Sequence, residues 1–89
     1  MPLFAVICRD NPGALQTRLD TRPAHVEWLK AGPVQLAGPL VEDGEMRCSL
    51  LVIEADDLAA ANAWVATDPY KAAGLFASVE VIEWRKVIG

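Results

Sequence analysis

Residues 34–54 read VQLAGPLVEDGEMRCSLLVIE, two largely apolar stretches on either side of a short acidic segment. The Asp43-Gly44 pair inside that segment is typical of the tight turn between two antiparallel strands, because both residue types tolerate positive φ. The sequence therefore predicts a β-hairpin with strands from Val34 to Val41 and from Arg47 to Glu54 and a turn over Glu42 to Glu45.

The segments that flank the hairpin predict further strands and a helix. The apolar run from Leu3 to Cys8 predicts a first strand, and the segment from Phe76 to Ile88 predicts a last one. Asn11-Pro12 predicts the start of a helix, after which apolar residues recur every three or four positions until Gly32. The chain thus begins with a strand and a long helix.

A second helix is predicted to begin after the capping pair Asp56-Asp57 and to end at Thr67, and a short helical turn follows over Pro69 to Ala73. The resulting order, β-α-β-β-α-β in 89 residues, is typical of a single ferredoxin-like α+β sandwich. We therefore expect one domain over residues 1–89, with a four-stranded antiparallel sheet and both helices on one face.

The second face of that sheet is predicted to be covered by another copy of the chain. The runs from Leu3 to Cys8 and from Leu50 to Ile53 are apolar at every position, whereas a solvated face would alternate with polar residues. Because no element is left to cover this face, we expect a homodimer through the open sheet face. The alternative is that the runs reflect only the high hydrophobic content of 53%.

Composition excludes several classes of partner. A net charge of −4 and the lack of a Lys/Arg cluster argue against nucleic acid. The apolar N-terminus is too short for a membrane span and lacks the basic flank of a signal peptide, so we expect a cytoplasmic protein without a membrane partner. Cys8 and Cys48 have no metal-binding spacing, which predicts buried reduced thiols and neither a metal nor another cofactor.

His25 is the one side chain whose ordinary pKa lies near neutrality. It follows Arg18 and Arg22 at steps of four and three, which places all three on one face of a continuous helix. This cationic strip beside an imidazole suits an anionic or phenolate ligand, with His25 as a base. The alternative is a solvated face on which the arginines pair with Asp20 or Glu27.

Two further segments carry candidate site residues. In Asp68-Pro69-Tyr70, the carboxylate can orient an imidazole, and the same Asp68 is suited to cap the short helix that follows. Gly38 and Pro39 interrupt the predicted second strand, which indicates a bulge, a close approach by a ligand, or an edge strand. Each segment therefore has a structural and a functional interpretation.

Taken together, these motifs resemble the YciI-like (YCII-related) family, and the likeness covers nearly the whole chain. The motifs are the run from Arg18 to His25, Ala37-Gly38-Pro39, Asp68-Pro69-Tyr70 with the following Ala73 to Phe76, and Trp84 to Ile88. The resemblance implies the dimeric α+β barrel fold, with His25 and Asp68 as the active-site pair. It also implies kinship with muconolactone isomerase and with a dehydrochlorinase of a chlorinated hydroxyhydroquinone.

Pro23 raises a geometric question about that pair. A straight helix from residue 12 would place His25 about 20 Å from the end of the sheet at which Asp68 is expected, at the start of the last strand. We therefore predict a broken helix, in which a first piece over Asn11 to Asp20 lies across the end of the sheet and a second piece opens at Pro23. His25 then lies within reach of Asp68.

The leading hypothesis is a small dimeric cytosolic enzyme, of isomerase, lyase or dehydrochlorinase type, acting without a cofactor on a small anionic or phenolic molecule. His25 acts as general base or acid, and Asp68 orients it. The pocket is shaped by Arg22, Gly38, Pro39 and Tyr70. The alternative is a non-catalytic module that binds a small ligand or a partner through the same cleft. A third possibility, a cofactor-free oxygenase, is supported only by analogy of fold.

Overall fold

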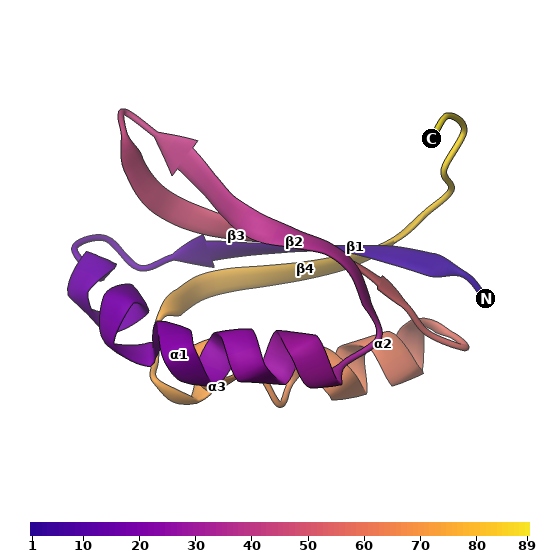
Figure 1. The fold of residues 1–89 in the computed structure, drawn as a ribbon, viewed down its shortest axis with the longest axis horizontal. Helices are drawn as coiled ribbons and strands as arrows, with labels where there is room; N and C mark the ends of the chain where they lie inside the picture. Colours follow the sequence, from indigo (N-terminus) through magenta and orange to yellow (C-terminus); the bar gives the residue numbers. More distant parts are fainter.

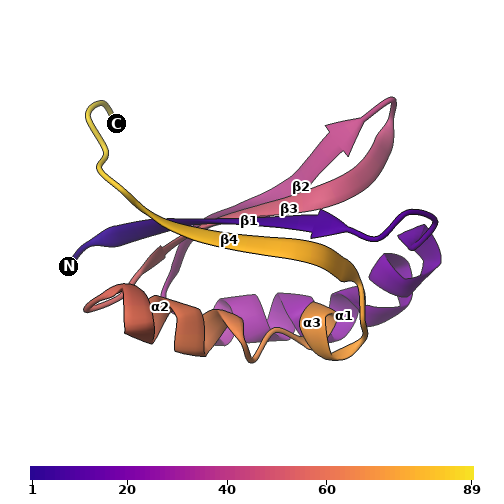
Figure 2. The same cartoon turned by 180° about the vertical axis from the view of Figure 1, so that it is seen from behind.

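A computed structural model describes residues 1–89 and contains four strands and three helices in the predicted order (Figure 1). The strands are β1 (Leu3–Asp10), β2 (Val34–Glu42), β3 (Glu45–Glu54) and β4 (Phe76–Trp84); the helices are α1 (Leu15–Ala31), α2 (Leu58–Val65) and α3 (Pro69–Ala72). All neighbouring strands pair antiparallel in the order β2-β3-β1-β4. The helices lie on one face of the sheet and leave the other open (Figure 2). The predicted ferredoxin-like α+β sandwich is confirmed.

The hairpin that joins β2 and β3 forms around the Asp-Gly pair as predicted. Asp43 has φ 51° and Gly44 has φ 79°, and Glu42 pairs with Glu45 across the turn. Positive φ at both central residues gives the turn a twist that matches the twist of the two strands. The far end of the hairpin curls away from the helices (Figure 1).

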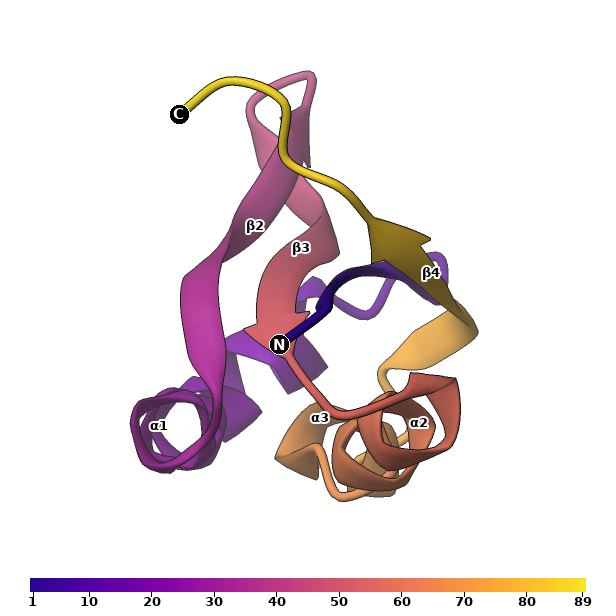
Figure 3. The ribbon, with the colours of Figure 1, turned by 90° about the vertical axis from the view of Figure 1, so that its right-hand side faces the viewer.

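The helices divide the covered face of the sheet into two regions. Figure 3 shows α1 on the β2 side of the sheet and α2 and α3 on the β4 side. The buried apolar cluster joins the helix-facing residues of β1 and β3 to α2; its members are Phe4, Val6, Cys8, Leu51, Ile53, Ala55, Ala61 and Val65. The region between α1 and the sheet is less completely filled by apolar side chains, and it contains the cavity described below.

The predicted break of the first helix at Pro23 is wrong. α1 runs without interruption from Leu15 to Ala31 with Pro23 inside it. Its first turns bend away from the axis of the longer part that follows (Figure 1). A proline removes one backbone hydrogen bond and crowds the preceding turn, which is a sufficient cause for a bend. The helix accommodates Pro23 by bending, and no second cap is needed.

The predicted helix start at Asn11-Pro12 is also wrong. The backbone N–H of Asn11 donates to the Leu75 carbonyl at 2.7 Å, and its side-chain amide donates to the Gly74 carbonyl at 3.1 Å. Gly13 then adopts φ 73°, a left-handed conformation that a helix cannot include. Asn11 therefore ties the loop before α1 to the start of β4, and α1 begins at Leu15.

The last strand is shorter than predicted. Trp84 pairs with Leu3, the first residue of β1, so that β1 has no residue left to pair with the segment 85–88. Residues 85–89 are exposed and leave the sheet on its open side (Figure 2). The second helix also ends early, at Val65, and Thr67 lies in the turn that follows. None of the helices is both long and apolar enough to cross a membrane.

Both cysteines are free and buried, as predicted for reduced thiols. Cys8 is fully enclosed on the helix-facing side of β1. Burial, with a further contribution from the negative charge of Asp68, raises the pKa of its thiol to about 12. Because the thiolate is the reactive form, Cys8 is a packing residue.

The shifted thiol predicts a pH dependence of stability. An unfolded chain releases the Cys8 proton at about pH 8.5, whereas the folded chain keeps it to about pH 12, so the free energy of unfolding falls as pH rises through this range. The free energy of unfolding, measured by urea denaturation, should fall between about pH 7.5 and about pH 10 in the wild type. This fall should be about 2 kcal/mol smaller in Cys8→Ala. An equal loss in both proteins would contradict the buried thiol.

Candidate active site

Asp68 joins the start of α3 to the middle of α1. It precedes Pro69 in extended backbone conformation, and its Oδ1 accepts a hydrogen bond from the Tyr70 backbone N–H at 2.9 Å. The same Oδ1 accepts from Nδ1 of His25 at 2.9 Å, and both side chains are buried. The predicted proximity of His25 and Asp68 is confirmed, and Asp68 caps α3 as well.

The pair meets although α1 is unbroken, because Asp68 lies elsewhere than expected. α3 lies between Asp68 and the start of β4 at Phe76, so Asp68 is not at the beginning of the last strand, where the sequence prediction placed it. The bend of α1 carries its first turns past the end of the sheet (Figure 1). His25, one of two buried residues of α1, therefore faces α3.

Aromatic rings hold the imidazole of His25 in one plane. The Tyr70 ring stacks on it with centroids 3.9 Å apart and an interplanar angle of 17°. Trp28 lies against it with ring centroids 5.6 Å apart, and Phe76 packs edge-on against Tyr70. Since Asp68 fixes Nδ1, the nitrogen that is free for a ligand is Nε2.

Arg18, which the sequence placed in the cationic strip with His25 but not among the residues that shape the pocket, lines the cavity described below. It is only 3% exposed, and its Nε and Nη2 donate to the two carboxylate oxygens of Asp10 at 2.8 and 2.7 Å. Nη2 also donates to Ser49 Oγ at 2.8 Å, and the guanidinium carbon lies 5.0 Å from the centroid of the Tyr70 ring. Pairing of Arg18 with Asp20 or Glu27 is thereby excluded.

The charges around Tyr70 keep their ordinary protonation states at neutral pH. Burial disfavours the charge on Arg18, but the hydrogen bond and the negative charge of Asp10 outweigh burial and raise its pKa. Burial raises the pKa of Tyr70 above its usual range, against the opposing charges of Arg18 and Arg22. Tyr70 is thus a neutral phenol beside a permanently charged guanidinium.

These residues surround a cavity of about 150 Å³ between α1, α3, β2 and β3. Its lining consists of Arg18, Arg22, His25, Val26, Leu29, Ala37, Gly38, Pro39, Met46, Ser49, Leu51 and Tyr70. Five of the six predicted site residues are among them. The sixth, Asp68, does not line the cavity but accepts a hydrogen bond from His25, which does. β2 is an edge strand, which explains how its backbone tolerates Pro39.

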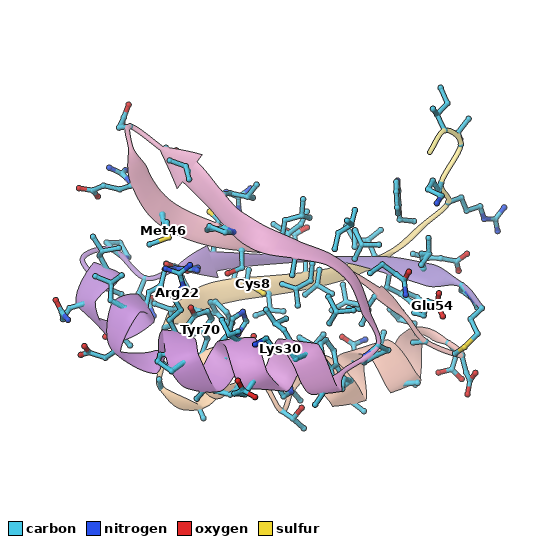
Figure 4. All side chains as sticks on the ribbon, viewed as in Figure 1. Cys8, Arg22, Lys30, Met46, Glu54 and Tyr70 are labelled. Carbon is cyan, nitrogen blue, oxygen red and sulfur yellow. The ribbon has the colours of Figure 1, made fainter.

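Arg22 is the cation that remains available at this cavity. Its side chain is exposed and forms no ion pair, whereas the charge of Arg18 is balanced by its ion pair with Asp10. Figure 4 shows Arg22 above Tyr70 and below Met46, near the point where the hairpin leaves the sheet. The cavity therefore combines one free positive charge, one imidazole nitrogen and an apolar wall.

No group of three or more His, Cys, Asp or Glu side chains is arranged to hold a metal ion. The polar groups at the cavity are instead suited to hydrogen bonds and charge pairing. A neutral imidazole that is held through Nδ1 can take a proton at Nε2 and return it. The arginines can bind an anionic oxygen.

Comparisons with known proteins give one consistent assignment. The model of the YCII-related domain matches residues 2–85. Protein YciI of Escherichia coli O6:H1 is 33% identical, over 96% of this chain and 98% of its own length, and a protein of Haemophilus influenzae is 30% identical over 94% and 97%.

A solved structure is similar throughout the fold. It is the 5-chloro-2-hydroxyhydroquinone dehydrochlorinase TftG of Burkholderia phenoliruptrix AC1100, in complex with 2,5-dihydroxybenzoquinone. Its sequence is 36% identical, the alignment covers 93% of each chain, and the TM-score is 0.82. The similarity thus extends to a protein that holds a small ring compound.

The buried ion pair of Arg18 predicts a stability effect. Asp10→Asn leaves the guanidinium buried without its countercharge, which should lower the free energy of unfolding by about 3 kcal/mol. The control Glu83→Gln removes a partner of the exposed Arg85 and should cost less than about 1 kcal/mol. Equal urea midpoints for the two variants would contradict the structural role of Asp10.

Proposed function

The chain belongs to the YCII-related family, and on that basis we propose that it is an enzyme that uses His25 and Asp68 for general acid–base catalysis on a small anionic or phenolic molecule. The observation that carries the proposal is the 2.9 Å hydrogen bond from His25 Nδ1 to Asp68, at the wall of a cavity. No other histidine exists in the chain.

The proposed chemistry is proton transfer without a cofactor. Asp68 accepts a hydrogen bond from Nδ1–H, which leaves the lone pair of the neutral imidazole on Nε2, and its carboxylate stabilises the imidazolium that forms. A proton taken from the substrate and returned at another position gives isomerisation. If the substrate instead expels an anion with the electron pair of the broken bond, the result is elimination.

The size and charge of the cavity support a substrate with one ring. A cavity of 150 Å³ holds a molecule of about the size of benzene. Arg22 supplies a positive charge for an anionic oxygen, and Arg18 and Ser49 add polar atoms to the lining. Gly38 and Pro39 bound the site on β2. The similarity to a dehydrochlorinase with a bound dihydroxybenzoquinone supports the same class.

The proposal includes a homodimer that works in the cytoplasm. One row of the open sheet face runs across all four strands through Leu36, Val52, Ala5 and Ile82. Leu36 is 66% exposed and Ile82 is 52% exposed, so that the row presents large apolar side chains to solvent. Burial against a second copy would remove this apolar surface from water.

The catalytic proposal is tested by two substitutions at the pair. A thermal-shift screen of small carboxylates, lactones and phenols, including 2,5-dihydroxybenzoquinone, identifies a ligand, and turnover is then followed on that ligand class. His25→Ala should leave its binding constant within a few-fold and lower turnover by about 10²–10⁴-fold. Asp68→Asn should lower turnover similarly while keeping the cap of α3, because asparagine also caps helices.

Other results would contradict this assignment. If His25→Ala abolishes binding and the wild type never shows turnover, the site belongs to a binding module. If Asp68→Asn keeps full turnover, the carboxylate contributes only the cap.

The dimer is tested by mass in solution. Sedimentation should give twice the chain mass of 9.6 kDa for the wild type and one chain mass for Ile82→Lys, since a charge buried in an apolar interface is costly. The exposed Leu58→Lys on α2, in the helix layer on the opposite face of the sheet, is the control and should remain dimeric. A wild-type protein with the mass of one chain would contradict the proposed dimer.

A further inference from the structure

An irregularity in the pairing of β2 and β3 decides where Met46 points. Leu40 pairs with Cys48, and the next residue of β2, Val41, pairs with Met46. β2 thus advances by one residue while β3 advances by two, which leaves Arg47 as an extra residue in β3. This is the arrangement of a β-bulge, in which one strand carries an additional residue. Beyond that residue, the side chains of the strand switch the face of the sheet to which they point.

The bulge moves Met46 to the helix-facing side of the sheet. In a regular strand, Met46 would share a face with Cys48 and Leu50, because alternate residues point the same way. With Arg47 inserted, it instead joins Ser49 and Leu51, and all three line the cavity. Figure 4 shows Met46 where the hairpin leaves the sheet, above Arg22.

Met46 is also the one residue shared by two cavities. Beyond the cavity that contains His25 lies a second one of about 440 Å³, bounded by the hairpin, the end of β1 and the loop before α1. Its lining is more polar and includes Arg9, Glu42 and Arg47. Of all the residues around the two cavities, only Met46 belongs to both.

We propose that Met46 limits the size of the ligands that the site accepts, because its side chain closes the smaller cavity off from the larger one. This inference rests on the proposed function, since it concerns the same site. The thioether is unbranched and flexible, so it packs against a single ring at the mouth. A second fused ring needs the space that the Met46 side chain occupies. The larger cavity becomes accessible only when that side chain is shortened.

The test compares a one-ring and a two-ring probe. Dissociation constants are measured by calorimetry for 2,5-dihydroxybenzoquinone and for 2-hydroxy-1,4-naphthoquinone. The wild type should bind the first and not measurably the second. Met46→Ala should bind the two-ring probe at least about tenfold more tightly than the wild type, the effect of removing methylene-sized steric obstruction from a pocket. Met46→Val should give a smaller gain in the same direction.

Met46→Leu is the matched control, because it keeps the volume of the side chain and should keep the wild-type selectivity. A gain of binding cannot result from partial unfolding. The inference is overturned if Met46→Ala leaves the ratio of the two dissociation constants unchanged, or if Met46→Leu alters that ratio as much as alanine does. If the wild type binds neither probe, the proposed ligand class fails, and this inference fails with it.

Discussion

One carboxylate oxygen, Oδ1 of Asp68, holds the site together. It accepts from the backbone N–H of Tyr70 and from Nδ1 of His25, so that one atom both starts α3 and anchors α1 to it. Tyr70 then lies flat against the imidazole, and the guanidinium of Arg18 lies over the phenol ring. The cavity owes its shape to this column of stacked groups, since each member is fixed by a neighbour.

Much of the fold follows from local patterns in the sequence. The Asp43-Gly44 turn, the apolar strands and the Asp68-Pro69 cap each depend on residues close in the chain, and each forms as predicted. The contact between His25 and Asp68 was also predictable. The sequence identifies each residue separately, His25 as a titratable group on a helix and Asp68 as a capping carboxylate. The family resemblance then paired them, and the YCII-related match agrees with it.

The rest depends on tertiary contacts that no local pattern reveals. Asn11 looks like a helix cap, but its donors are used by carbonyls at the start of β4. Arg18 shares the helical face of His25, yet its partners, Asp10 and Ser49, come from two different strands. Met46 reaches the cavity only through a bulge in strand pairing. A continuous helix through Pro23 is possible because a bend is sufficient.

The central claim is that Asp68 fixes the proton of His25 on Nδ1 and leaves Nε2 as the base. Since the chain has one histidine, long-range proton–nitrogen NMR correlations of the wild type report on this ring alone. In the neutral ring, the nitrogen shifts should identify the Nδ1–H tautomer, and Asp68→Ala, which removes the acceptor, should remove that preference. A neutral ring protonated at Nε2 in the wild type would contradict the account.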